Sequence, residues 1–263
     1  MKKTSWHHLN FYISIIILLS LSHACSGTPS SPSTQVPLST ATDFPKLPTI
    51  TTEPSPTVDA VATIMAYSTE VTSAKKMEVE EILAGYEIDL PEGELSWEEK
   101  DEISVSQTNY RRISWQSIAN QVDYKNYILY TRSTWTSTSG IAGCGIIVRL
   151  ESDIIDGEYY LFNTTRLSGA ASWKVEYWDE GKRVNYPSGG SINTDYINIE
   201  QGSTNEYVLV MLDNELNIYA NGYHLGHVLV SSLDEGMLGV VVWQESGETE
   251  CAFNDSWLWR INE

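Results

Sequence analysis

The sequence predicts a mainly β protein, an antiparallel two-sheet sandwich preceded by a helical segment and a disordered linker. Three observations lead to this prediction. From residue 86 onward, short runs rich in β-branched and aromatic residues alternate with turn signals. Residues 58–85 instead place apolar side chains three and four positions apart. Residues 26–57 are mostly Ser, Thr and Pro, and so lack the apolar side chains that a core needs.

Length and charge restrict the class of protein. The 263 residues suffice for one main domain. Lys and Arg total 16 against 35 Asp and Glu, which gives a formal net charge of −19. A surface of this charge repels phosphate backbones and anionic headgroups. We therefore expect no nucleic-acid partner and no membrane docking through a basic surface.

Residues 1–24 are typical of a signal peptide. Lys2 and Lys3 precede a mostly apolar run over residues 11–21, which is shorter than the roughly 20 residues of a membrane span. Cys25 follows Ala24 as in a bacterial lipobox, in which the cysteine is lipidated, although Leu21 lies one position further away than the usual lipobox leucine. We expect an extracellular protein whose only membrane contact is a lipid on Cys25, with simple secretion as the alternative.

The segment that follows the signal peptide is a predicted tether. Residues 25–57 contain seven of the nine prolines of the chain. Such a composition favours a semi-extended, disordered segment that holds a domain away from a surface.

The predicted helical segment covers residues 58–85. Apolar residues such as Val61, Ile64, Val71, Met77 and Leu83 follow a loose helical spacing, and Gly85 suits the end of a helix. Polar residues interrupt this stripe at positions 68, 69 and 72. The sequence therefore leaves open whether the helix is a stalk or packs on the following domain.

Residues 86–263 form the predicted β-sandwich domain. Asn221-Gly222 is the strongest hairpin signal, because both residues tolerate the positive φ of a type I′ turn. Asp156-Gly157 and Asp213-Asn214 are further turn signals. The expected strands are Glu102–Gln107, Arg112–Gln116, Asn126–Trp135, Gly145–Leu150, Glu158–Thr164, Trp173–Trp178, Tyr196–Glu200, Glu206–Leu212, Glu215–Ala220, Tyr223–Leu229, Met237–Trp243 and Glu250–Ile261.

Several segments resemble one superfamily. Residues 206–226 read EYVLVMLDNELNIYANGYHLG, and residues 236–242 and 251–257 follow as a Gly-x-x-Gly strand and a Phe-Asn-rich last strand. This order is similar to the C-terminal half of a concanavalin A-like lectin/glucanase jelly roll, including laminin-G-like modules. Residues 143–149 and 156–162 resemble a hairpin of the same superfamily. The resemblance covers residues 126–261 and implies a jelly-roll fold more than a function, since it consists of turn and core residues.

The cysteines are consistent with export. If Cys25 takes a lipid, Cys144 and Cys251 remain as a pair in an oxidising compartment. The resemblance implies that their strands run side by side, which favours a disulfide. The alternative is a nucleophilic Cys144 that uses His224 or His227 as a base.

Catalytic and metal-binding patterns are weak. Glycanases of the resembled fold use Glu-x-Asp-x-x-Glu on a strand, whereas the near match at residues 151–156 ends in Asp and lies in a predicted turn. The resemblance therefore carries over no catalytic residue. We expect no cofactor and no metal, with calcium at Asp153, Asp156 and Glu158 as the alternative to a merely solvated cluster.

Strand parity suggests a binding face. Ile146, Val148 and Leu150 are expected to face the core, and Arg149 to face away from it. Aromatic rings stack on sugars, and charged groups bond to sugar hydroxyls. The alternative is that these aromatic residues only cover a sheet. The predicted ligand-binding residues are Tyr130, Arg132, Arg149, Tyr159, Glu176, Trp178 and Trp243.

These observations favour a non-catalytic, surface-anchored module that binds carbohydrate. Its expected partner is a glycan or a surface polysaccharide. Two alternatives remain: a glycoside hydrolase-like enzyme of the same fold, and a laminin-G-like module with a protein partner.

Overall fold

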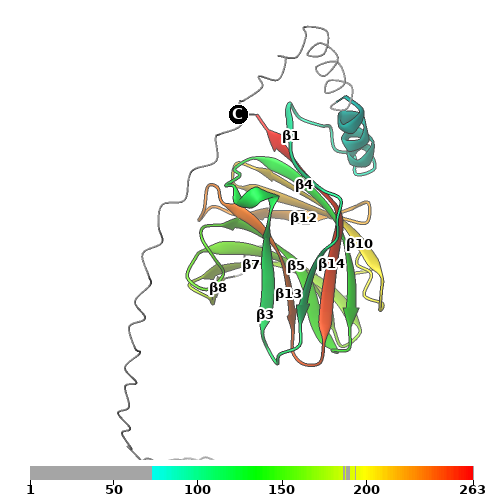
Figure 1. Cartoon of the computed structure of the whole chain (residues 1–263), viewed down its shortest axis with the longest axis vertical. Helices are drawn as coiled ribbons and strands as arrows, with labels where there is room; N and C mark the ends of the chain where they lie inside the picture. The colour runs from blue at the N-terminus through cyan, green and yellow to red at the C-terminus, as the bar shows by residue number, and fades with distance from the viewer. Residues whose placement is uncertain (1–72, 186, 188–189, 193, 263) are drawn as a thin grey trace, which may run out of the picture. The chain divides into compact units, whose positions relative to one another are not determined.

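Figure 1 shows the computed structural model of the chain, which describes residues 73–185, 187, 190–192 and 194–262. Two antiparallel seven-stranded sheets face each other. The predicted antiparallel sandwich of jelly-roll type is confirmed. The signal peptide, Cys25 and the tether predicted from the sequence lie outside the described residues. In the described part of the chain, no helix is long and apolar enough to cross a membrane.

Strands from both ends of the described chain form the first sheet. Its order is β1 (Gly93–Glu99), β14 (Thr249–Ile261), β4 (Tyr127–Ser137), β10 (Thr204–Leu212), β11 (Glu215–Ala220) and β12 (Tyr223–Leu229), and β2 (Ile103–Gln107) also pairs with β14. The β11–β12 hairpin has the expected turn, with φ of 50° at Asn221 and 84° at Gly222.

The second sheet contains the middle of the chain. Its order is β3 (Ile113–Ile118), β13 (Met237–Gln244), β5 (Ile141–Leu150), β6 (Tyr159–Leu167), β7 (Ala170–Asp179) and β8 (Lys182–Asn185), and β9 (Gly190–Ile192) pairs with β7. The short 3₁₀ helix η1 (Ala119–Gln121) links the two sheets between β3 and β4.

One expected strand, Tyr196–Glu200, is wrong. Ile197 and Ile199 pack against the core, which gives the segment its alternating pattern. Its backbone bonds to a side chain instead of a strand, because the Asn198 N–H donates to Asn205 Oδ1 over 2.7 Å. The sequence also missed β1, β8 and β9.

The core lies between the two sheets. Leu129 and Leu209 of the first sheet and Ile146 and Phe162 of the second are almost fully buried there. A disulfide joins Cys144 to Cys251 with the Cα atoms 5.8 Å apart. It links β5 and β14, which lie in opposite sheets, so the expected side-by-side arrangement of these strands is wrong. The disulfide therefore ties the two layers together across the core.

A bulge near the end of β5 changes the expected parity. Met237 pairs with Leu150 and Gly239 with Ile147, so Val148 and Arg149 lie opposite a single residue of β13. Ile146 and Val148 face the core as expected, whereas Leu150 joins Ile147 in the outer cluster of the second sheet.

A helix over residues 73–84 packs on the outer face of the first sheet. Val79 and Leu83 are fully buried against a cluster that contains Ile128, Val208 and Trp257. Lys75 Nζ lies 2.7 Å from Glu98 Oε1 of β1. The described part of the predicted helical segment is therefore a layer of the domain and not a stalk.

Candidate functional site

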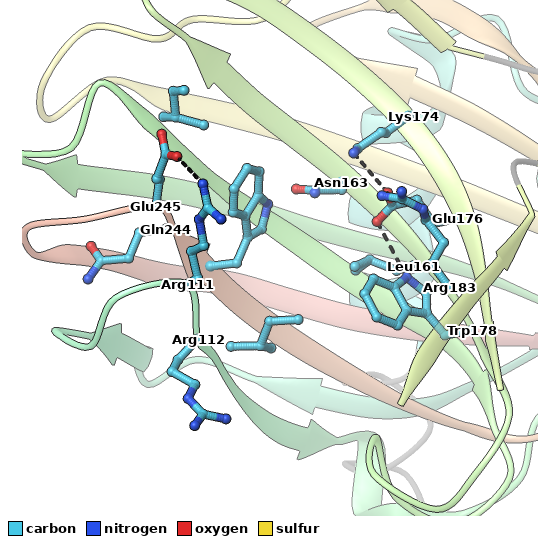
Figure 2. Close-up of a pocket in the computed structure, with 13 residues that line it drawn as sticks. Arg111, Arg112, Leu161, Asn163, Lys174, Glu176, Trp178, Arg183, Gln244 and Glu245 are labelled. Atoms are coloured by element: carbon cyan, nitrogen blue, oxygen red, sulfur yellow. Dashed lines mark hydrogen bonds and ion pairs between the residues drawn. The ribbon is translucent and has the colours of Figure 1, made fainter. Parts of the chain in front are cut away.

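A hollow of about 450 Å³ lies on the outer face of the second sheet. Side chains from β3, β13, β5, β6, β7 and β8 line it (Figure 2). Its size falls in the range of small-molecule ligand pockets. In Figure 2, Asn163 and Leu161 lie between the Arg111–Glu245 pair at one end and Lys174, Glu176 and Trp178 at the other.

Two glycines of β5 create the space. Cys144 and Ile146 point into the core, so Gly143 and Gly145 face the hollow. A Cβ atom at Gly143 would lie 2.5 Å from Trp243 Nε1 and 2.6 Å from Asn163 Oδ1. Any larger residue at position 143 would therefore displace the two side chains that close over β5.

Polar atoms on this face have no bonding partner. Asn163 Oδ1, Thr165 Oγ1 and Trp243 Nε1 are buried without a hydrogen bond, and they account for three of the eight such side-chain atoms in the described residues. A buried polar atom without a partner costs about 1–3 kcal/mol. Of these three residues, Asn163 and Trp243 line the hollow, so an amide oxygen acceptor and an indole N–H donor without partners lie at its edge.

Glu176 organises the other end of the hollow. Its side chain is only 4% exposed, and Oε1 accepts bonds from Lys174 Nζ at 2.8 Å and Arg183 Nη1 at 3.3 Å. Oε2 accepts the Trp178 indole N–H at 3.4 Å. Its carboxylate thus fixes two cations and one indole around a single buried charge.

Tyr159 of β6 stacks beside Trp178, its cross-strand neighbour on β7. The two rings stack with centroids 6.0 Å apart and an interplanar angle of 4°. Burial and the nearby charge of Glu176 raise the pKa of Tyr159, so its hydroxyl stays neutral. Trp178 is half-buried and lines the hollow, where its ring stacks on Tyr159 and its indole N–H donates to Glu176.

The structure brings together only part of the predicted ligand-binding set. Glu176, Trp178 and Trp243 line the hollow, and Tyr159 stacks on Trp178 without lining the hollow itself. Tyr130 belongs to the first sheet, where it is 6% exposed and stacks on Trp257 with centroids 5.3 Å apart. Arg132, also on β4, pairs with Glu206 at 3.4 Å and Asp255 at 3.1 Å.

Arg149 does not face outward, so that expectation is wrong. With φ of 54° at the β5 bulge, its side chain turns into the protein and is fully buried. Its guanidinium donates to the backbone carbonyl oxygens of Asp213, Val230 and Leu233. Arg149 therefore holds the end of the sandwich together.

Sequence reasoning missed several lining residues. Asn163 and Lys174 share the parity of Tyr159 and Glu176, so the same alternation rule identifies them once the strands are known. Arg183 lies on β8, a strand that the sequence did not predict. Gly143 and Gly145 carried a signal of their own, because glycine inside a strand often marks a close approach.

The acidic segment between β5 and β6 is a turn, as predicted. Asp153 Oδ1 accepts the N–H groups of Ile155 and Asp156 at 2.7 and 3.0 Å, and these bonds lower the pKa of Asp153. Among the described residues, no group of three or more His, Cys, Asp or Glu is placed to hold a metal ion.

Comparison with known proteins identifies folds of similar outline. No family model and no curated protein matches the chain. Among solved structures, a carbohydrate-binding module from Bacillus subtilis is 14% identical, with a TM-score of 0.47, over 59% of this chain and 85% of its own. A legume lectin-like domain from Entamoeba histolytica is 13% identical, with a TM-score of 0.44, over 61% of this chain and 84% of its own. A β-glucanase from Bacillus licheniformis is 12% identical, with a TM-score of 0.40, over 61% of this chain and 79% of its own.

Proposed function

We propose that the protein binds carbohydrate, without cleaving it, in the hollow over Gly143. The observation that carries this proposal is the combination of two half-buried indoles, Trp178 and Trp243, with the unpartnered amide oxygen of Asn163 in the lining of one hollow. Sugars present apolar faces that stack on aromatic rings and hydroxyl groups that bond to amides and indole N–H groups. The hollow offers both kinds of contact in one place.

Hydrolysis fits this geometry poorly. The carboxylates that line the hollow are Glu176 on β7 and Glu245 just after β13. These strands are separated by β5 and β6, hence by three strand spacings, or about 14 Å. Glycosidases need two carboxyl groups about 5–9.5 Å apart. Each carboxylate is also paired with a cation, Glu176 with Lys174 and Glu245 with Arg111.

The N-terminal sequence supports an extracellular location for this binding activity. The signal-peptide pattern of residues 1–24 and the lipobox-like Cys25 support an extracellular, lipid-anchored protein, with secretion as the alternative. The Ser, Thr and Pro content of residues 25–57 supports a tether that presents the hollow to a surface polysaccharide.

A glycan and polysaccharide array, probed with the purified protein with and without calcium, tests the proposal. Saturable binding that Trp178→Ala or Trp243→Ala weakens by roughly tenfold is the expected result. Trp115→Ala is the matched control, because Trp115 is a half-buried indole of the same sheet that does not line the hollow. Absence of binding to every glycan would refute the proposal and direct the search to a protein partner.

A further inference from the structure

Two polar side chains converge over the floor of the hollow. Trp243 of β13 lies opposite Gly143 of β5 in the strand register, and Asn163 of β6 lies opposite Gly145. The two side chains therefore flank β5, and neither glycine places a side chain between them. A Cβ atom at Gly143 would lie 2.5 Å from Trp243 Nε1 and 2.6 Å from Asn163 Oδ1, so these two atoms are at most about 5 Å apart.

The fold gives neither of these atoms a hydrogen-bond partner among the described residues, although Asn163 is only 2% exposed. Both residues line the hollow, and in Figure 2 the amide oxygen of Asn163 points towards the Arg111–Glu245 end. Most buried polar atoms in proteins are paired. A buried donor and a buried acceptor that lie close together and both remain unpaired therefore point to a partner that a ligand supplies.

The two atoms restrict the chemistry of this partner. The indole N–H needs an acceptor, and the amide oxygen needs a donor. A hydroxyl group is both, and two hydrogen bonds of about 2.8 Å allow its oxygen to join atoms that are about 5 Å apart. An ether or ester oxygen only accepts, and an ammonium group only donates. A free hydroxyl is therefore the sugar group that satisfies both atoms through a single oxygen.

We propose that a free hydroxyl of the bound glycan lies between Trp243 and Asn163, where it accepts the indole N–H and donates to Asn163 Oδ1. This inference rests on the proposed function and adds a substrate class, namely glycans in which this hydroxyl carries no substituent and forms no glycosidic bond. An oxygen that is methylated, acylated or linked to another sugar has no proton, so it leaves Asn163 Oδ1 unpaired. Because this contact involves no charge, the selection does not depend on ionic strength.

The first test compares the glycan that binds most tightly on the array with its monodeoxy and mono-O-methyl analogues, one pair for each hydroxyl. We expect one position at which both analogues bind the purified protein roughly tenfold more weakly, because they leave buried polar atoms unpaired. This loss should be the same at low and high sodium chloride concentration. If every hydroxyl can be removed or methylated without such a loss, the inference is wrong.

Two variants then locate the sensitive hydroxyl. Trp243→Phe keeps an aromatic ring but removes the N–H, and Asn163→Leu keeps a similar volume but removes the oxygen. In each variant, the preference for the glycan over its sensitive deoxy analogue should fall from roughly tenfold to roughly threefold or less. A preference that stays near its original value in both variants would overturn the inference, because the hydroxyl would then be recognised elsewhere.

The stability of the free protein separates a ligand-binding role of Asn163 from a structural one. Asn163→Leu should leave the urea midpoint unchanged or raise it, since an unpaired buried polar atom destabilises the folded state. A lower midpoint with an unchanged preference would assign the amide to the fold and contradict the inference. Thr165→Val is the matched control, because Thr165 Oγ1 is also buried without a described partner on this face but does not line the hollow. This variant should leave the affinity and the preference unchanged.

Failure of this inference and failure of the proposed function give different results. Binding of a glycan with no sensitive hydroxyl contradicts this inference and leaves the proposed function intact. Binding to no glycan at all contradicts the proposed function, and this inference with it.

Discussion

The outer faces of the two sheets have similar side chains but different surroundings. On the first sheet, Tyr130 and Trp257 stack and are buried together with Val79 and Leu83 of the helix. On the second sheet, Tyr159 and Trp178 also stack, but Trp178 reaches an open hollow. Strand alternation produces both faces, and the helix decides which of them is covered. An aromatic pair across two neighbouring strands therefore indicates a binding face only when nothing packs over it.

The largest expected difference concerns stability. Trp257→Ala removes an indole that is 1% exposed between the first sheet and the helix, and should lower the free energy of unfolding by about 3–5 kcal/mol. Trp115→Ala on the second sheet, a half-buried indole, should cost much less. Urea unfolding of both variants measures the difference. Equal losses would contradict the contrast between the two faces.

A smaller effect is expected at the floor of the hollow. In Gly143→Ala the new Cβ would lie 2.5 Å from Trp243 Nε1 and 2.7 Å from the Thr164 carbonyl oxygen. Strain of this kind costs about 1–3 kcal/mol, and displacement of Trp243 should abolish glycan binding. Gly169→Ala is not a suitable control, because Gly169 has φ of 95°. Gly140→Ala is suitable, since a Cβ there meets nothing within 4 Å.

High pH should affect the covered face. Burial and the charge of Glu206 raise the pKa of Tyr130 to about 12, above its value of about 10 in the unfolded chain. The folded state therefore binds the phenol proton more tightly than the unfolded chain does. The stability that this tighter binding contributes is complete below pH 10 and is lost as the pH rises towards 12. Tyr130→Phe should reduce this loss, measured as urea unfolding at about pH 9 and pH 11.5. An unchanged pH dependence would contradict the assignment.

The sequence predicted the sandwich because its strands carry a strong local signal. The β11–β12 hairpin is a clear case, since alternating apolar residues and Asn221-Gly222 define it without tertiary information. The strands β8 and β9 are short and exposed, and so lack the buried alternation that identifies a strand. Ile197 shows the opposite failure, because it is buried in the core although the segment that carries it is a loop and not a strand.

The candidate site was predicted only in part. Parity correctly sent Trp178 and Trp243 outward, but it failed at Arg149 because a bulge inserts one residue that no local pattern announced. Parity also could not tell that Tyr130 is covered whereas Trp178 reaches the surface. The helix that covers Tyr130 lies more than 40 residues earlier in the chain. Such placement depends on tertiary packing, which a single strand does not encode.

The most direct test of the binding face follows the indole N–H signals in an NMR titration of the ¹⁵N-labelled protein with a glycan that binds on the array. We predict that the signals of Trp178 and Trp243 shift with increasing glycan, and that the signal of Trp257, buried under the helix, does not. Shifts at Trp257 with none at Trp178 and Trp243 would contradict the account and place the ligand on the first sheet.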